Sequence, residues 1–265
     1  MYRTGQGVAQ NYKTAVKWFT LAGEQGNSDA QSNLGFMYSR GIGVPQDVKT
    51  AVKWYKLAAE QGDSLAQYNL GMMYENGEGV PKNVKTAIKW YTLAAEQGNA
   101  NAQSYLGYMY SRGIGDAQDV KTAIKWFTLA AEQGNANAQL NMGLMFRNGL
   151  GVKQDNKTAV KWYKLAAEQG NSDAQYNLGW MYQEGLGVTQ NDKTALKWYR
   201  LAADQQHNRA QYSLGWMYDF GLGVQQNYAT AARWYRLAAE QGDSDAQYAL
   251  GSMFRLGYGV VKNNK

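Results

Sequence analysis

Residues 171–206 read NSDAQYNLGWMYQEGLGVTQNDKTALKWYRLAADQQ, and this stretch decides the fold. Its apolar side chains recur every three or four positions in two segments, which is helical spacing. The two stripes consist of Ala174, Leu178, Met181 and Tyr182, and of Ala195, Trp198, Tyr199 and Ala202. Gly-Leu-Gly-Val separates them, and glycine pairs of this kind interrupt a helix. The stretch therefore predicts two helices, helix A over residues 172–184 and helix B over residues 192–204.

The same unit recurs along the whole chain. One tryptophan marks each unit at a constant interval of 36 residues: Trp18, Trp54, Trp90, Trp126, Trp162, Trp198 and Trp234. A fixed period of roughly 20 to 50 residues is typical of solenoids, propellers and other repeat arrays. Because the segments have helical spacing, the period predicts an all-α solenoid of helix hairpins.

The residues that precede each helix support these boundaries. The position before helix B holds only the best N-cap residues: Asn11, Asp47, Asn83, Asp119, Asp155, Asn191 and Asn227. The position before helix A reads Asn27, Asp63, Asn99, Asn135, Asn171, His207 and Asp243. Only His207 departs from the pattern, in a turn where Gln206-His207 replaces Gly-Asn.

A glycine stands in the middle of every helix A, against helix propensity: Gly35, Gly71, Gly107, Gly143, Gly179, Gly215 and Gly251. Such a glycine costs about 1 kcal/mol relative to alanine. A common cause is required, and close approach of helix B to the backbone of helix A supplies it. We therefore expect Gly143→Leu to separate the two helices by steric overlap.

Composition excludes much enzyme chemistry. The chain has 265 residues, no cysteine and one histidine, with a formal net charge of +6. These counts exclude a thiol nucleophile, a cysteine-based metal site and a multi-histidine metal site. No apolar run approaches the roughly 18 residues of a membrane span. We expect no cofactor and no metal.

The first and last units are incomplete. We expect a single array with a partial repeat at 1–27, six full repeats at 28–243 and a partial repeat at 244–265. Solenoids need polar end caps, and neither end carries one. The ends predict a segment of a longer array, although a short natural chain with open ends would read the same way. Open ends also allow end-to-end self-association, and the sequence assigns no cellular compartment.

The repeated motif resembles a known family. It reads A-x-x-x-L-G-x-M-Y-x-x-G-x-G-V, then D/N-x-x-x-A-x-x-W-Y-x-x-A-A-x-Q-G, and residues 66–98 match it in full. This is similar to the Sel1-like repeat, the 36-residue relative of the tetratricopeptide repeat. Three departures are local: Asp116 replaces the valine of G-x-G-V, Ala229 replaces the lysine of K-T-A, and Gln206-His207 alters one turn.

The resemblance implies a right-handed superhelix that acts as an adaptor. Helix A would line the concave face and helix B the convex face. Such families bind peptides, folded proteins or components of the cell envelope. The expected function is therefore a non-catalytic scaffold that binds a protein or peptide, with glycan or peptidoglycan binding as the alternative.

Binding residues are expected at the helix-A positions that vary between units. The candidates are Phe36, Arg40, Tyr68, Met72, Tyr108, Arg112, Leu144, Tyr176, Trp180, Glu184, Tyr212, Trp216, Phe220 and Tyr248. Tyrosine, tryptophan and arginine are enriched at binding hot spots. Tyr176, Trp180, Tyr212 and Trp216 are expected to form the largest aromatic patch. Alternatively, these aromatic residues only pack against neighbouring repeats.

Helix B carries lysine pairs spaced i,i+4: Lys49 and Lys53, Lys85 and Lys89, Lys121 and Lys125, Lys157 and Lys161, Lys193 and Lys197. Each pair shares one face of its helix, and this face could either bind nucleic acid or simply be exposed to solvent. We favour the solvated face and expect no nucleic-acid partner. The G-x-G-V turns lack the Gly-Lys-Ser/Thr ending of a phosphate loop and follow a helix, so they are turns.

Catalysis has little support. Cysteine-bridged Sel1-like proteins are linked to β-lactam hydrolysis, but this chain has no cysteine. It also lacks S-x-x-K, because glutamine stands fourth in the runs that begin at Ser28, Ser64 and Ser172, and it lacks K-T-G. His207 is the one candidate imidazole base, and we interpret it as ordinary variation in a turn.

Overall fold

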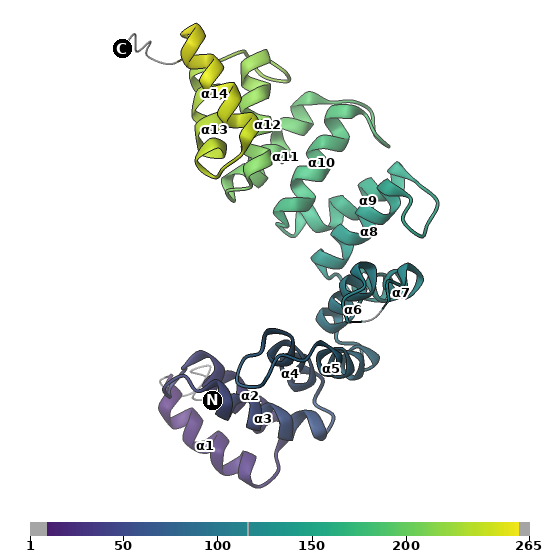
Figure 1. Cartoon of the computed structure of the whole chain (residues 1–265), viewed down its shortest axis with the longest axis vertical. Coiled ribbons are helices and arrows are strands. Elements are labelled where there is room, and N and C mark those ends of the chain that lie inside the picture. Colours follow the sequence, from purple (N-terminus) through teal and green to yellow (C-terminus); the bar gives the residue numbers. More distant parts are fainter. Residues whose placement is uncertain (1–9, 116, 260–265) are drawn as a thin grey trace. The chain divides into compact units, whose positions relative to one another are not determined.

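The computed structural model describes residues 10–115 and 117–259, and within them it contains fourteen α-helices and no strand. Each of these helices has 13 residues. Figure 1 shows them in chain order, coloured from purple near the N-terminus to yellow near the C-terminus. The helices predicted at 172–184 and 192–204 are found as Ser172–Glu184 and Asp192–Asp204. The prediction of an all-α repeat solenoid is confirmed. Asp116 lies outside the described residues.

The chain divides into two compact units, Met1–Gln133 and Gly134–Lys265. The first unit contains α1 (Tyr12–Glu24), α2 (Ser28–Arg40), α3 (Val48–Glu60), α4 (Ser64–Asn76), α5 (Val84–Glu96), α6 (Ala100–Arg112) and α7 (Val120–Glu132). The second contains α8 (Ala136–Asn148), α9 (Asn156–Glu168), α10 (Ser172–Glu184), α11 (Asp192–Asp204), α12 (Asn208–Phe220), α13 (Tyr228–Glu240) and α14 (Ser244–Leu256). Even-numbered helices are helix A of a repeat and odd-numbered helices are helix B. Within each unit, every helix packs against the next one in the chain.

The predicted N-caps are present, and one expectation about them is wrong. Asn and Asp side chains accept the free first-turn N–H groups, as Asn191 does from Thr194 at 2.9 Å. His207 was expected to break this pattern, but its Nδ1 accepts the N–H of Ala210 at 3.1 Å. An unprotonated ring nitrogen offers the same lone pair as an amide oxygen, so the imidazole caps α12.

The predicted turn role of the G-x-G-V glycines is confirmed at Gly221 and Gly223. Gly221 ends α12 with φ of 71°, and Gly223 has φ of 65°. A Cβ on Gly223 would lie 2.5 Å from the carbonyl carbon of Asp192, at the start of the preceding helix B. The loop therefore packs against the preceding repeat.

The mid-helix glycines are explained by an aromatic ring. A Cβ on Gly143 would lie 2.5 Å from Cδ1 and Cε1 of Tyr163, which is fully buried on α9. The same contact recurs at the preceding and following repeats, with Tyr55, Tyr91, Phe127, Tyr199 and Tyr235. The last such glycine, Gly251, meets nothing within 4 Å. Close approach of helix B is thus confirmed, and the contacting group is its ring.

Tryptophan and glutamine join successive repeats. Trp198 on α11 is partly buried against a core cluster that α9 of the preceding repeat and α10 of its own repeat form together. Gln175 is buried on α10, donates to the carbonyl of Ala167 at 3.1 Å and accepts from Gln205 at 2.8 Å. One buried amide therefore bonds both the preceding and the following helix B.

Candidate functional site

Ten of the fourteen predicted binding residues line three hollows on the A helices. Phe36, Arg40 and Met72 line one of about 250 Å³ in the first unit. Leu144, Tyr176 and Trp180 line one of about 390 Å³ in the second unit. Tyr212, Trp216, Phe220 and Tyr248 line one of about 470 Å³, also in the second unit. The remaining candidates, Tyr68, Tyr108, Arg112 and Glu184, line none of these three.

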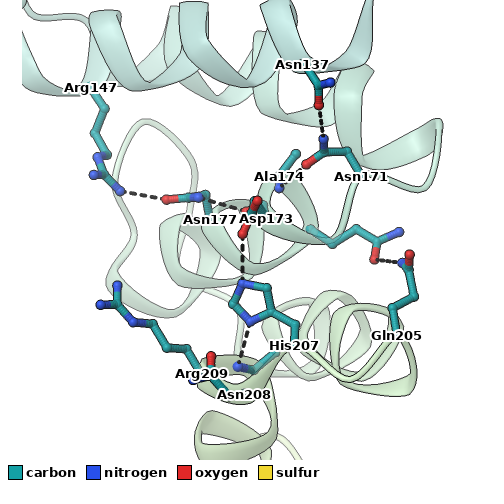
Figure 2. A network of polar contacts seen from close by, with 12 residues as sticks. Asn137, Arg147, Asn171, Asp173, Ala174, Asn177, Gln205, His207, Asn208 and Arg209 are labelled. Atoms are coloured by element: carbon teal, nitrogen blue, oxygen red, sulfur yellow. Dashed lines mark hydrogen bonds and ion pairs between the residues drawn. The ribbon is translucent and has the colours of Figure 1, made fainter. Parts of the chain in front are cut away.

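The 390 Å³ hollow, called here the arginine hollow, lies between α8, α10 and α12. Its residues are Leu144, Arg147, Asp173, Tyr176, Asn177, Trp180, His207, Asn208 and Arg209. Figure 2 shows that the Arg147 and Arg209 guanidinium groups lie on the same side of Asp173 and His207. The hollow therefore combines the N–H donors of two arginines with the aromatic side chains of Tyr176 and Trp180.

His207 connects α12 to α10 by hydrogen bonds at one side of the arginine hollow. Its Nδ1 accepts from the Ala210 N–H, so Nε2 carries the proton and donates to Oδ1 of Asp173 at 3.1 Å (Figure 2). This hydrogen bond holds the pKa of Asp173 below its usual range, and Arg209 adds a smaller effect in the same direction. The imidazole also stacks on Tyr176, with ring centroids 4.9 Å apart.

Arg147 is positioned by two contacts from α10. Its Nη1 donates to Oδ1 of Asn177 at 2.7 Å, and its guanidinium carbon lies 5.3 Å from the ring centroid of Trp180. Burial raises the pKa of Tyr176, whereas the charges of Arg209 and Arg147 oppose this rise. The charges of both arginines therefore influence the pKa of the same group, the Tyr176 hydroxyl.

The 470 Å³ hollow, called here the aromatic hollow, lies between α12 and α14. Tyr248 and Phe220 are the most exposed rings in it, at 78% and 61%. The Trp216 and Phe220 rings lie 5.5 Å apart. Asp219 and Asp245 also line it, and burial raises the pKa of Asp219. The hollow therefore offers aromatic faces beside carboxylates.

The four residues expected to form one aromatic patch lie in two hollows. Tyr176 and Trp180 line the arginine hollow, whereas Tyr212 and Trp216 line the aromatic hollow. Among the other candidates, Tyr68 is half-buried between Tyr91 and Tyr105, with centroids 5.8 and 5.9 Å away. Its ring therefore packs between repeats.

Tyr108, Arg112 and Glu184 are exposed. Arg112 lies over the ring of Tyr108, with its guanidinium carbon 6.0 Å from the centroid.

Sequence reasoning missed Arg147, Asp173, Asn177 and Arg209. These residues occupy helix-A positions that were not compared between repeats. The position of Arg209 holds Asp29, Leu65, Asn101, Asn137, Asp173 and Asp245 in the other repeats. A basic residue there is a departure, and a comparison at every position of the repeat would have found it.

No cluster of metal-ligating side chains occurs in 10–115 and 117–259. Within the same ranges, no helix combines the length and apolar character that a membrane crossing requires. The paired lysines of helix B are exposed.

Comparisons with known proteins extend these observations. The Sel1 repeat family matches eight consecutive segments: 1–27, 28–63, 64–99, 100–135, 136–171, 172–207, 208–243 and 244–265. No curated protein matches the chain.

Among solved structures, a protective antigen of uropathogenic Escherichia coli with an SLR fold is 39% identical, with a TM-score of 0.88. The match covers 99% of this chain and 56% of the antigen, so the chain spans about half the antigen's length. A Sel1 repeat protein from Oxalobacter formigenes is 37% identical over 86% of this chain and 91% of its own, with a TM-score of 0.79.

Proposed function

Because the chain belongs to the Sel1 repeat family, whose members are generally protein-interaction scaffolds, we propose that it binds a protein or peptide partner through its A helices. The observation that carries this proposal is the placement of the variable residues. The repeated residues fill the core, whereas ten variable ones line hollows of 250 to 470 Å³. Hollows of this size accept individual side chains of a partner.

The aromatic hollow supports the proposal most directly. Tyr248 and Phe220 expose most of their surface beside the partly buried Trp216. Tyrosine and tryptophan bury large areas at low entropic cost and dominate binding energies at interfaces. This hollow is therefore the anchor site of the proposed interface.

The surroundings of His207 support a binding role rather than catalysis. Its Nδ1 accepts a backbone N–H and its Nε2 faces Asp173. A general base needs a free lone pair within reach of the substrate proton. Both ring nitrogens are engaged in the fold, so His207 is a structural residue in this proposal.

The test compares three baits in a pull-down from extract of the source cell. They are the wild-type chain, a Phe220→Ser/Tyr248→Ser variant, and a matched control, Leu237→Ser. Leu237 is 44% exposed on α13, a helix B, so the control removes a comparable apolar side chain from a B helix. Circular dichroism checks that all three fold.

A captured protein is then purified and titrated against each bait by calorimetry. We expect at least tenfold weaker binding to the Phe220→Ser/Tyr248→Ser variant, and unchanged binding to Leu237→Ser. Equal affinity for all three baits would refute the aromatic hollow as the anchor site of the interface. Binding that soluble peptidoglycan fragments compete and peptides do not would favour the glycan alternative.

A further inference from the structure

Two residues of the arginine hollow, His207 and Arg209, differ in type from the residues at the same positions of the other repeats. Arg209 stands where six other repeats have Asp, Asn or Leu, and His207 stands where they have Asn or Asp. The position of Arg147 holds Ser39, Glu75, Ser111, Gln183, Asp219 and Arg255 in the other described repeats. His207 and Arg209 are therefore departures from the repeat, whereas Arg147 lies at a variable position that carries arginine again at Arg255. All three line one hollow of about 390 Å³.

Neither arginine of this hollow has an ion-pair partner among the described residues. The ion pairs among the described residues are Lys56 with Glu60 and Lys164 with Glu168. The contact between His207 and Asp173 is a hydrogen bond from a neutral imidazole. Asp173 is the one carboxylate that lines the hollow, and its hydrogen bond goes to His207. Two arginines thus line the hollow without an ion-pair partner among the described residues, and Asn177 and Trp180 hold the guanidinium group of Arg147.

Because of Arg147, the core residue Tyr163 also lacks a hydrogen-bond acceptor that tyrosines of other repeats have. In three other repeats, those with Tyr91, Tyr199 and Tyr235, the residue 16 positions before the tyrosine accepts from its hydroxyl. Glu75 accepts from Tyr91 at 2.6 Å, and Gln183 accepts from Tyr199 at 2.8 Å. Arg147 occupies this position before Tyr163 but extends to Asn177 and Trp180.

The Tyr163 hydroxyl is buried and has no hydrogen-bond partner among the described residues. An unpaired buried hydroxyl destabilises a fold. Departures of this kind are expected where a residue is kept for function.

We propose that the arginine hollow binds the side-chain carboxylate of an aspartate or glutamate within the partner. Arg147 and Arg209 donate charge-assisted hydrogen bonds to this carboxylate, and Trp180 packs against its methylene groups. This inference rests on the proposed function, and it identifies the chemical group of the partner that one of the hollows binds.

The net charge of the hollow favours one carboxylate over a phosphate dianion. With His207 neutral, the two arginines and Asp173 leave the hollow with one net positive charge. One carboxylate neutralises it, whereas a phosphate dianion would face Asp173 with a surplus of negative charge.

A neighbouring hollow gives room for a partner to extend beyond the arginines. The arginine hollow lies between α8, α10 and α12, and the aromatic hollow follows between α12 and α14. We therefore take the carboxylate to be that of an internal residue, and a probe with a free α-carboxylate tests a chain end in its place.

The test uses small probes and the full ¹⁵N-labelled chain. The probes are N-acetylglutamate α-amide, its neutral match N-acetylglutamine amide, N-acetylglutamine with a free α-carboxylate, and inorganic phosphate. The readout is the indole N–H resonance of Trp180, identified by its loss in Trp180→Phe. We expect saturable shifts with N-acetylglutamate α-amide that exceed those of the other three probes.

Repeat-guided variants sharpen the result. Arg147→Gln places the residue of the following repeat, Gln183, at this position, and Arg209→Asn places there the residue found two repeats earlier, Asn137. Each should weaken binding by about tenfold to a hundredfold, the range for hydrogen bonds to charged groups. Arg255→Gln removes the same charge at the equivalent position of α14, outside the hollow, and should leave binding unchanged.

Stability provides a second readout. Arg147→Gln should restore an acceptor for Tyr163 and raise the midpoint of thermal unfolding by about 2–4 °C. A lower midpoint would make Arg147 a structural residue and overturn the proposal. So would equal shifts from the neutral probe, stronger binding of the α-carboxylate or of phosphate, or no shift at all. Because these probes need no partner, a failure here leaves the pull-down result standing.

Discussion

Adding one methyl group at Gly143 tests the ring contact that repeats along the chain. The Cβ of Gly143→Ala would lie 2.5 Å from two carbons of the Tyr163 ring, which is fully buried and has no space to move. Overpacking of this kind costs about 1–3 kcal/mol, and the better helix propensity of alanine offsets about 1 kcal/mol. We expect a net destabilisation of up to about 2 kcal/mol.

Gly251→Ala is the matched control, because the same position of α14 faces open space. Here alanine should stabilise the helix by up to about 1 kcal/mol. Urea unfolding followed by circular dichroism measures both variants. Amide exchange in α8 and α9 adds a local measurement, since repeat arrays can open in segments.

Equal stabilisation by Gly143→Ala and Gly251→Ala would refute the steric explanation. A third variant separates ring from hydroxyl. Tyr163→Phe keeps Cδ1 and Cε1, the two contacting carbons, so it should not rescue Gly143→Ala. Rescue would mean that the hydroxyl, and not the ring, sets the spacing between α8 and α9.

Three further changes test local features of the fold. Gln206 has φ of 65° where other repeats have glycine, so Gln206→Gly should stabilise the chain by about 1 kcal/mol in urea unfolding; a loss of stability would contradict this. His207→Ala should lower the free energy of unfolding by about 1 kcal/mol because it removes the N-cap of α12, whereas His207→Asn should preserve the cap. Protection of the Ala210 amide from hydrogen exchange measures whether the cap is present. Burial raises the pKa of Tyr55 and Tyr163 to about 12. The unfolded chain then releases these protons first, so stability should fall between pH 10 and 12 by about 1.4 kcal/mol per pH unit for each tyrosine; Tyr163→Phe should flatten this fall.

His207 shows where sequence reasoning about local structure was wrong. The residue was classed by type, and histidine is not a usual N-cap. The backbone geometry of the turn nevertheless places Nδ1 on the Ala210 N–H at 3.1 Å. The requirement is an acceptor lone pair at that place, and the neutral imidazole supplies one.

The candidate site was predictable in part. Leu144, Tyr176 and Trp180 vary between repeats and line the arginine hollow. Arg147 was not predicted, because its sequence position equally suits a bond to Tyr163. Its direction is set by Asn177 and Trp180, 30 and 33 residues further along the chain.

The sequence by itself determined the helices, their ends and their pairing. These depend on contacts within a turn or between consecutive helices, such as Asn191 capping α11 or Gly143 against Tyr163, and the 36-residue period repeats each signal. Only the tertiary structure decided which variable residues share a hollow. Tyr176 and Tyr212 occupy the same position of the repeat, yet they line different hollows. Their surroundings come from side chains of two or three repeats, and a pattern read within one repeat does not contain them.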